Sequence, residues 1–451
     1  MDIFSLFKDD IFIITLVASA TWYLYLLKLT EQKRISQILE IPSSVLVLLF
    51  VFKAYPLDKL SPETLVYGDT PLINILLRLI IWGASLLLIR KWVGKLFVNL
   101  AEIFKEPTIR LLLFWSLISA TWSATPIFSA WSTLIVVGFS GIATTFAKKY
   151  SWEDFYNLLR WVLFVCGVIS IVGTIIGNPL PGGLGSIGYL NFYGDTSNKP
   201  LANFLALNTG LWVLNLVSFP KRQLMSGFIA ISSFVPIFYI NSVANIFTAI
   251  ILICLVLLLF SVKRFNSKHV PIIICLYLFL SVLLLVYLQS NIGEIFDAFG
   301  KSTNLTGRGT NVWPAVIKEI SKQPFVGYGF ASYWQPWRGL QDPSINFEMY
   351  GSITHAHNGF LELVLQLGLV GLSLFLAVLV KTFHLSLKYF FKSNSLRDSI
   401  LPLLLLVYVI ITCLAETPRL GVFGPHHIWL FLVFILANLN AESRKISGKI
   451  I

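Results

Sequence analysis

The sequence predicts an all-α polytopic membrane protein with about 12 or 13 transmembrane helices. Only 12% of the 451 residues are charged, while 56% are hydrophobic. A soluble globular protein carries roughly 25% charged residues. The apolar residues also form continuous runs that do not alternate with period two, which favours membrane helices over a transmembrane barrel.

The apolar runs give the expected membrane spans in chain order. They are 10–28, 39–54, 72–90, 108–122, 126–147, 156–177, 199–218, 223–240, 243–262, 269–289, 358–383, 399–415 and 424–440. The run 39–54 is short for a bilayer that needs about 20 residues, so the count is 12 or 13. The first run is too long for the core of a signal peptide and lacks a small-residue cleavage site, which predicts a retained helix.

The basic residues predict the orientation, because Lys and Arg gather in short loops on one side of the bilayer. If all thirteen spans are real, these loops fall on one side, which is the cytoplasm, and the C-terminus is then inside and the N-terminus outside. The net charge of +12 then reflects topology and not nucleic-acid binding. Residues 91–107 are predicted to lie as an amphipathic stretch on the inner surface. The basic loop residues are Lys33, Arg34, Arg90, Lys91, Lys95, Lys148, Lys149, Lys221, Arg222, Lys263, Arg264, Lys381, Lys388, Lys392, Arg444 and Lys445.

One large loop, 290–357, interrupts the apolar runs on the outer side. It separates an N-terminal transmembrane bundle, 1–289, from C-terminal transmembrane helices with a cytoplasmic tail, 358–451. A loop of this length is usually functional or disordered, and this one has no low-complexity composition. It is therefore the first place to look for a site.

Within this loop the sequence predicts a short amphipathic helix. Asn311 is expected to cap it, and Pro314 suits its first turn. Gly327-Tyr328-Gly329-Phe330 then turns the chain. The apolar positions at i, i+3, i+4 and i+7 are Trp313, Val316, Ile317 and Ile320. Interface anchoring is the predicted role for most of the loop's rings, which are Trp313, Tyr328, Phe330, Tyr333, Trp334 and Trp337.

The residues best suited to catalysis lie where this loop meets the next apolar run, at His355-Ala356-His357-Asn358. An imidazole titrates between pH 5 and 8 and can act as base or acid. If a helix begins at Asn358, its exposed amides offer a site for an anion such as phosphate, and Asn358 and Glu362 share a face. The alternative stays open that His-x-His is an ordinary polar loop at the membrane surface. No spacing indicates a metal site.

Three cations are candidates for a phosphate site on the same side. Arg308, which follows Thr306-Gly307, brings a guanidinium suited to bidentate phosphate binding. Arg419 lies at the outer end of the penultimate span, and Lys199 opens the seventh span. Each has a plainer interpretation: Arg308 touches lipid headgroups, Arg419 pairs with Glu416, and Lys199 snorkels to the interface.

The order and spacing of these motifs resemble the O-antigen ligase/polymerase superfamily, most of all its exopolysaccharide polymerases. The many-helix layout with one large outer loop late in the chain extends the resemblance to most of the sequence. It implies a GT-C-like fold in the cell (inner) membrane, with the active site facing the periplasm or exterior. The residues that carry it are Thr306-Gly307-Arg308, Trp313, Ile320, Pro324, Gly327-Tyr328-Gly329, His355-Ala356-His357-Asn358, Leu361-Glu362, Gly368 and Gly371.

The resemblance also implies an inverting glycosyltransferase that needs no metal and no cofactor. Its donor is a glycan on a polyprenyl-pyrophosphate carrier, and its acceptor is a hydroxyl of a glycan or a lipid. Membrane lipid and other polysaccharide-export proteins are the further partners expected. Exopolysaccharide or O-antigen polymerisation is the favoured activity, and ligation of O-antigen to lipid A core is the alternative.

The site residues follow from the resemblance by motif. His357 matches the expected base, and His355 matches a position that is often His. Arg308 matches the arginine expected to hold pyrophosphate. Many relatives carry a basic residue near 241–245 that this chain lacks, so Lys199 and Arg419 are the candidates to substitute. The supporting residues are Thr306, Asn358 and Glu362.

A transporter or flippase for lipid-linked sugars is the alternative of another class. Transporters usually carry ionisable residues in mid-membrane, interrupted helices and paired halves. Here the middles of the apolar runs hold almost no charge, and no internal repeat is visible. The polar residues gather at one face of the membrane, which favours surface chemistry over passage through the bilayer.

Overall fold

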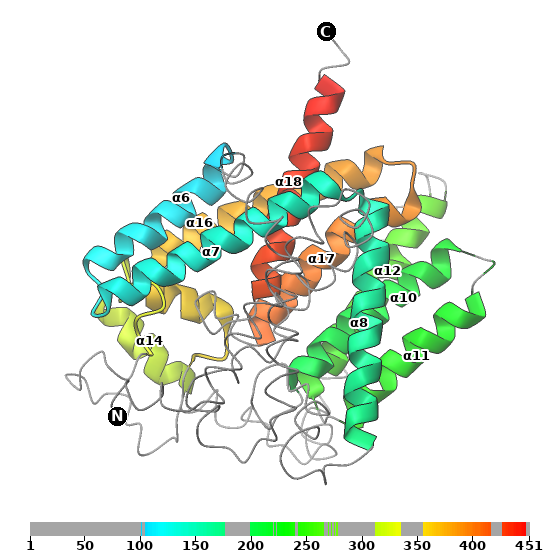
Figure 1. Cartoon of the computed structure of the whole chain (residues 1–451), viewed down its shortest axis with the longest axis horizontal. Helices are drawn as coiled ribbons and strands as arrows, with labels where there is room; N and C mark the ends of the chain where they lie inside the picture. The colour runs from blue at the N-terminus through cyan, green and yellow to red at the C-terminus, as the bar shows by residue number, and fades with distance from the viewer. Residues whose placement is uncertain are drawn as a thin grey trace, which may run out of the picture. The chain divides into compact units, whose positions relative to one another are not determined.

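Every regular element that the computed structural model describes is a helix (Figure 1). The described residues are 104–175, 199–219, 223–239, 242–265, 312–334, 355–415 and 426–447, with a few single positions between them. The predicted all-α fold is therefore confirmed. The helices are α6 (Pro107–Ile118), the 3₁₀ turn η3 (Ser119–Thr121), α7 (Pro126–Lys149), α8 (Trp152–Ile175), α10 (Lys199–Ser218), α11 (Gln223–Tyr239), α12 (Val243–Arg264), α14 (Trp313–Lys322), α16 (Gly359–Lys392), α17 (Leu396–Ala415) and α18 (His426–Ser447).

The helices follow the predicted apolar runs. α7, α10, α11 and α12 begin and end within two residues of the predicted bounds. α7, α12, α16 and most of α17 are each long and apolar enough to cross a membrane, as expected for a polytopic membrane protein. The runs 10–28, 39–54 and 72–90 and nearly all of 269–289 lie outside the described residues, so the total of 12 or 13 spans stays a prediction.

The chain divides into two compact units. One comprises Met1–Val98 and Trp161–Leu201, and the other comprises Asn99–Arg160 and Ala202–Ile451. The second unit contains nearly all of the described helices, and the packing and sites below belong to it. The three-part division at residues 289 and 357 concerns membrane topology and stays a prediction.

α11 shows why this unit suits a bilayer. Its outward face is a stripe of large apolar side chains, with Leu224 93% and Phe228 71% exposed. Its inward face carries smaller or polar side chains such as Ser226 and Ser233, which are buried. An apolar exterior over a partly polar interior is stable in lipid but unfavourable in water. The helix therefore indicates a lipid-facing surface.

α7 packs closely against α18 because one of its faces is built from small residues. Ser140 and Thr144 are buried there, and each donates its hydroxyl to the carbonyl four residues back, at 2.8 and 2.9 Å. Small side chains let helix backbones approach within a membrane, and the back-bonded hydroxyls leave little polarity exposed. Trp429 of α18 fills the remaining space and donates its Nε1–H to Ser140 Oγ at 2.7 Å.

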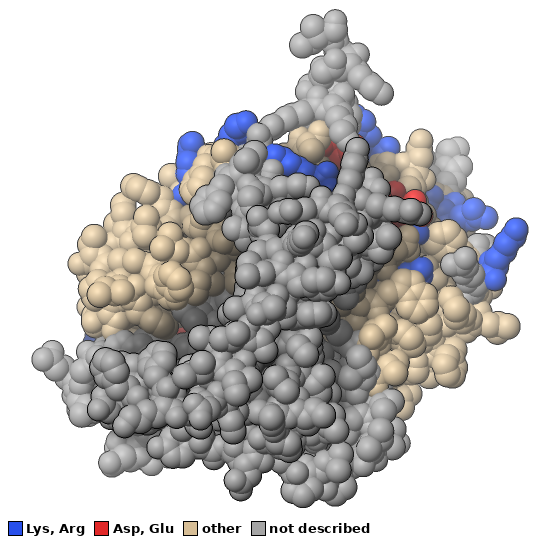
Figure 2. Space-filling view, in the orientation of Figure 1, with Lys and Arg blue, Asp and Glu red and all other residues tan. Residues whose placement is uncertain are grey.

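The two ends of the helices in this unit differ in charge. α7, α12 and α16 all end in lysine or arginine, and Figure 2 shows Lys and Arg side chains along the upper edge of the view. Lys263 at the end of α12 donates to Ser393 O at 2.7 Å, directly after α16. The opposite ends carry Thr125, Ser332 and the histidine motif. These two sets of helix ends are called the basic end and the histidine end below.

Candidate active site

The histidine end is organised by a break in α16 at Gly368. This residue has φ +68° and ψ −173°, so the helix stops there and restarts at once. The segment 324–329 of the loop docks into the break. Its hydrogen bonds are Tyr328 N to Leu365 O (3.0 Å), Gly329 N to Gln366 O (2.9 Å), Leu369 N to Pro324 O (2.8 Å) and Val370 N to Phe325 O (3.3 Å). Trp115 of α6 adds an Nε1–H bond to Leu367 O at 3.0 Å. The loop and α6 thus replace hydrogen bonds that a continuous helix would make itself.

Two glycines make this docking possible. A Cβ on Gly368 would lie 2.0 Å from Phe325 O, and its φ falls in the left-handed region. A Cβ on Gly327 would lie 2.5 Å from the carbonyl carbon of Gln366, and its φ is +66°. The Gly327-Tyr328-Gly329 motif, which the sequence indicated as a chain turn, therefore also locks the loop onto α16.

α14 supports the loop from the other side. Its amphipathic pattern and Pro314 in its first turn are confirmed. Val312, directly before α14, has helical backbone angles (φ −72°, ψ −52°) and makes no side-chain cap hydrogen bond. Asn311, the predicted cap, lies outside the described residues. Trp313 donates its Nε1–H to Ala356 O at 3.0 Å, which ties α14 to the histidine motif.

Two aromatic residues of this loop, Phe330 and Tyr333, turn inward and do not anchor at an interface, whereas Trp313, Tyr328 and Trp334 are half-buried. Phe330 is 2% and Tyr333 7% exposed. Tyr333 packs in a small core with Val316, Ala356 and Leu365. The physical reason is that the docked loop forms a local core over α16, and burying rings there removes more apolar surface from water than leaving them at an interface. Trp337 lies outside the described residues.

Glu362 is the buried centre of the site. Its side chain is 3% exposed and accepts three hydrogen bonds. Oε1 accepts from Trp334 Nε1 at 2.7 Å and from Gln366 Nε2 at 2.5 Å, while Oε2 accepts the backbone N–H of Ala356 at 2.8 Å. Gln366 Oε1 in turn accepts the N–H of Ala331 at 2.9 Å. A carboxylate fully supplied with donors fixes the loop between the two histidines.

His355 and His357 flank that fixed point. Ala356 between them is fully buried, and both histidines are partly exposed. Their ring centroids lie 3.9 Å apart with an interplanar angle of 48°. His357 has φ +53°, a conformation that costs a non-glycine residue energy and that often marks a functional position. The fold therefore presents two imidazoles side by side at the surface.

Asn358 begins α16 but changes the predicted anion site. Its side chain accepts the amides of Phe360 and Leu361 at 3.0 and 3.1 Å. These are two of the amides that an anion at the helix N-terminus would use. The Asn358 side chain therefore competes with a phosphate for these amides. The positive charge that binds a phosphate must come from basic side chains instead.

The structure brings together His355, His357, Asn358 and Glu362 of the predicted site. Thr306, Arg308 and Arg419 lie outside the described residues. Lys199 is the first residue of α10, where the backbone alone is described, and it belongs to the other compact unit. The cationic half of the predicted site therefore stays a prediction.

Sequence reasoning missed Gln366 and Trp334 as parts of the site. Both contact the Glu362 carboxylate, and Gln366 also holds Ala331. A signal was present, because Gln366 is a polar residue in an apolar run and lies one helical turn after Glu362. Trp334 gave no such signal, since its contact depends on how the loop folds back.

The match to a known protein family falls on this same part of the chain. Residues 228–376 match the O-antigen ligase family model. This segment resembles the O-antigen ligase family. The chain is also 31% identical over 148 residues to the exopolysaccharide production protein ExoQ of Rhizobium meliloti (strain 1021), a match that covers 32% of this chain and 33% of that relative. Both findings support the resemblance to the O-antigen ligase/polymerase superfamily, and the family segment contains the histidine pair, Glu362 and the break in α16.

Proposed function

We propose that the chain is a membrane glycosyltransferase that moves a glycan from a polyprenyl-pyrophosphate carrier to an acceptor hydroxyl, as a polysaccharide polymerase. The observation that carries the proposal is the paired imidazoles at the histidine end, held by Glu362 inside the segment that matches the O-antigen ligase family. A hydroxyl acceptor needs a base, and a positioned histidine supplies one.

The chemistry requires little else from the protein. The acceptor oxygen attacks the anomeric carbon and inverts it, His357 takes the hydroxyl proton, and the carbon–oxygen bond to pyrophosphate breaks with both electrons leaving on the phosphate oxygen. Pyrophosphate is already a good leaving group, so its negative charge needs stabilisation more than protonation. Arg308 is proposed for this, with Lys199 or Arg419 as the second cation, and no metal is proposed.

The proposed topology places the histidine end outside the cytoplasm. Lys and Arg gather at the basic end, at the far ends of the same helices, which is the pattern of cytoplasmic loops. The histidines then face the periplasm or exterior in an inner-membrane protein, and the C-terminus lies in the cytoplasm. A lipid-linked glycan presented from outside would reach the pair directly.

An O-antigen ligase is the second candidate, because the matching family model carries that description. Polymerase is favoured by the similarity to ExoQ, which is an exopolysaccharide production protein. The transporter alternative is weakened by the break in α16. The docked loop and α6 use the Leu365, Gln366 and Leu367 carbonyls of the break, whereas transporters leave such carbonyls to coordinate ions.

The test is complementation of a deletion strain, followed by the size profile of cell-surface polysaccharide. Wild type should restore long chains, and His357→Ala should not, at equal amounts in the membrane. His384→Ala is the matched control, because His384 is an exposed histidine on the same helix far from the site. A ladder of repeats indicates a polymerase, and transfer of intact glycan to a lipid core indicates a ligase.

Full complementation by His357→Ala would contradict the base assignment. Uptake of lipid-linked sugar into sealed vesicles without glycan transfer would contradict the enzyme and support a transporter. Arg308→Lys tests the cation separately. Full activity in that variant would argue against bidentate pyrophosphate recognition, because lysine is a point charge.

A further inference from the structure

The turn between α6 and α7 also holds the loop of the candidate active site. Two of its hydroxyls bond to the loop segment 329–334, more than 200 positions later in the chain. Ser119 Oγ accepts the backbone N–H of Phe330 at 2.9 Å. Thr125 Oγ1 donates to Ser332 Oγ at 3.0 Å. All four residues are buried. The path of the segment is therefore fixed by α6 and α7 as well as by α16.

Thr125 is unusual because it occupies the N-cap of α7 without capping the helix. Threonine is favoured at that position since its side-chain oxygen commonly accepts an amide of the first helical turn. Here the hydroxyl makes no such bond to the described amides of α7 and donates to Ser332 instead. The Thr125 amide is fixed by Ser123 Oγ at 3.0 Å, and Ser123 is itself bonded to Ser129 at 2.7 Å. The hydroxyl of Thr125 thus serves the loop and not the helix that follows it.

The same loop segment contacts the Glu362 network through the residue in between. The amide of Ala331 donates to Gln366 Oε1 at 2.9 Å, and Gln366 Nε2 donates to Glu362 Oε1 at 2.5 Å. Phe330 and Ser332, the two neighbours of Ala331, bond to the α6–α7 turn. Successive residues of one short segment are therefore held alternately by two elements that are far apart in the chain. The turn thereby determines where the Ala331 amide meets Gln366.

Backbone strain marks both ends of this network. Among the described residues, Ala331 (φ +58°) and His357 (φ +53°) are the non-glycine residues with a positive φ. The Ala331 amide donates to Gln366. Ala356, which precedes His357, donates its amide to Glu362 Oε2 at 2.8 Å. Such conformations persist only where the surrounding structure determines them strongly. The two strained backbones are therefore linked through the Glu362–Gln366 pair.

We propose that Thr125 is a positioning residue for the histidine pair. Its hydroxyl fixes Ser332, and the adjoining amide of Ala331 orients Gln366. Gln366 in turn orients the Glu362 carboxylate, which holds the amide between the two histidines. The inference rests on the proposed function for its catalytic consequence, whereas the positioning itself can be measured without any glycan.

Hydrogen–deuterium exchange of the purified full chain in detergent tests the positioning. Thr125→Val keeps the size of the side chain and removes the hydroxyl. A peptide that contains the Ala356 amide should exchange about fivefold to tenfold faster in this variant, the change expected from one lost hydrogen bond. Thr125→Ser keeps the donor and should exchange at the wild-type rate. Ser332→Ala should reproduce Thr125→Val, and the double variant should be no faster than either, because both changes remove the same bond.

Polymer formation in the complemented deletion strain is the second readout. Thr125→Val should lower the amount of long-chain polysaccharide about fivefold to tenfold at equal amounts in the membrane, because a displaced base is less effective. Thr125→Ser should restore it. A wild type that makes no polymer would contradict the proposed function alone, and the exchange at Ala356 would still decide the positioning.

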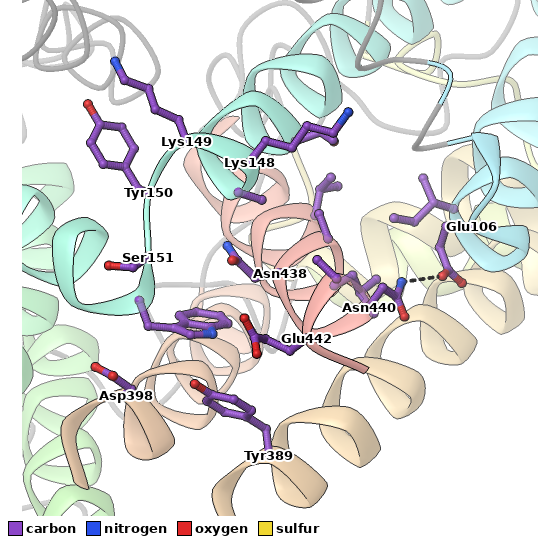
Figure 3. A pocket seen from close by; sticks show the side chains of 18 residues that line it. Glu106, Lys148, Lys149, Tyr150, Ser151, Tyr389, Asp398, Asn438, Asn440 and Glu442 are labelled. Atoms are coloured by element: carbon purple, nitrogen blue, oxygen red, sulfur yellow. Dashed lines mark hydrogen bonds between the residues drawn. The ribbon is translucent and has the colours of Figure 1, made fainter. Parts of the chain in front are cut away.

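Two controls separate positioning from general stability. Thr133→Val removes a buried hydroxyl of α7 that donates to Ser129 O, within the same helix, at 3.0 Å. Asn440→Leu removes a hydrogen bond between distant segments at the basic end, from Asn440 Nδ2 to Glu106 Oε2 at 2.8 Å (Figure 3). Asn440→Leu should lower the unfolding temperature, yet neither control should change the exchange at Ala356 or polymer formation.

Wild-type exchange at Ala356 in Thr125→Val would overturn the proposal, since the hydroxyl would then only pack the turn. Equal acceleration in Asn440→Leu would also overturn it, because a general loss of stability would explain the result. If Thr125→Val fails to fold, Ser332→Ala decides the outcome, since it removes the same bond from the side of the loop.

Discussion

The position of the histidine pair depends most directly on Glu362. Three N–H groups converge on its two oxygens, from Ala356, Trp334 and Gln366. An amide at this position would place an NH₂ group against at least one of these donors. The mismatch would be buried, and a buried donor without an acceptor costs about 1–3 kcal/mol.

Glu362→Gln should therefore lower the free energy of unfolding by about 1–3 kcal/mol. It should also reduce polymer formation by about tenfold to a hundredfold, because a small displacement of a catalytic group is costly. Trp334→Phe removes one of the three donors and should have the smaller effect on both quantities. Thermal unfolding in detergent and the polysaccharide size profile measure them, and wild-type values in Glu362→Gln would show that the carboxylate does not hold the loop.

Substitutions of His357 can separate the catalytic role of its side chain from the backbone strain at this position. Its φ of +53° is unfavourable for any residue with a Cβ, by about 1–2 kcal/mol. His357→Gly should therefore be more stable than His357→Ala by about 1 kcal/mol, while both lose polymer formation. Unfolding of the two purified variants side by side checks the difference. Equal stability would mean that the surrounding loop relaxes and that no strain resides at this position.

The sequence predicted which site residues lie together only where those residues are close together in the chain. His355, His357, Asn358 and Glu362 lie within eight residues, so their proximity follows from the chain itself. The contacts of Trp334 and Ala331 with this group depend on a loop that folds back from earlier in the sequence. Periodicity carries no information about such a fold-back, and the same holds for the predicted cations at 308 and 419.

At the scale of the element, α16 is two helices joined at Gly368. The join is stable because each half keeps its hydrogen bonds through the docked loop and Trp115. Gly368→Ala would place the alanine Cβ 2.0 Å from Phe325 O. It would also force a residue with a Cβ to adopt φ +68°. Both effects act against the docked state, and neither can be relieved by a side-chain rotation, since the contact is with backbone.

Gly368→Ala should destabilise the protein by about 3 kcal/mol or more and abolish polymer formation. Gly138→Ala is the matched control on α7, where an added Cβ would meet nothing within 4 Å. That variant should be neutral or more stable by up to about 1 kcal/mol, because alanine favours helix more than glycine. Unfolding temperatures of the two variants measure the contrast, and similar values would mean that the break in α16 is not required.

The helices themselves were predictable and the break was not. An apolar run shows where a helix can cross a bilayer, and the ends of α7, α10 and α12 agree with those runs. The run 358–383 passes through Gly368 without interruption, since both halves of α16 are apolar. The residues that decide the break, 324–329, lie about 40 positions upstream.

At the scale of the molecule, the described helices of the larger unit place two different chemistries at their two ends. The histidine end carries hydroxyls, imidazoles and one buried carboxylate, and the basic end carries most of the ionic contacts. Glu106 joins three distant segments at the basic end, because it lies before α6 and accepts from Lys381 of α16 and Asn440 of α18. The sequence predicted the basic end but not this three-helix junction.

Glu106 makes the stability of the basic end dependent on pH. Burial by itself raises the pKa of this carboxyl, but hydrogen bonds from Lys381, Asn440 and Thr108 and the charge of Lys381 outweigh it, so the pKa lies below the ordinary 4.5. A carboxyl with a lowered pKa in the folded state stabilises the protein above pH 4.5. That contribution is lost as the pH falls through the folded-state pKa, because the unfolded chain binds the proton more readily.

Wild type should therefore be more stable than Glu106→Gln at pH 7, and the difference should shrink as the pH falls below 4.5. Thermal unfolding of both proteins in detergent across this range measures it. Lys381→Met removes the same ion pair from the other partner and should destabilise at pH 7, whereas Lys388→Met, at an exposed position of the same helix, should not. A difference between wild type and Glu106→Gln that stayed constant with pH would mean that Glu106 acts by packing alone, and α6, α16 and α18 would then be joined without its charge.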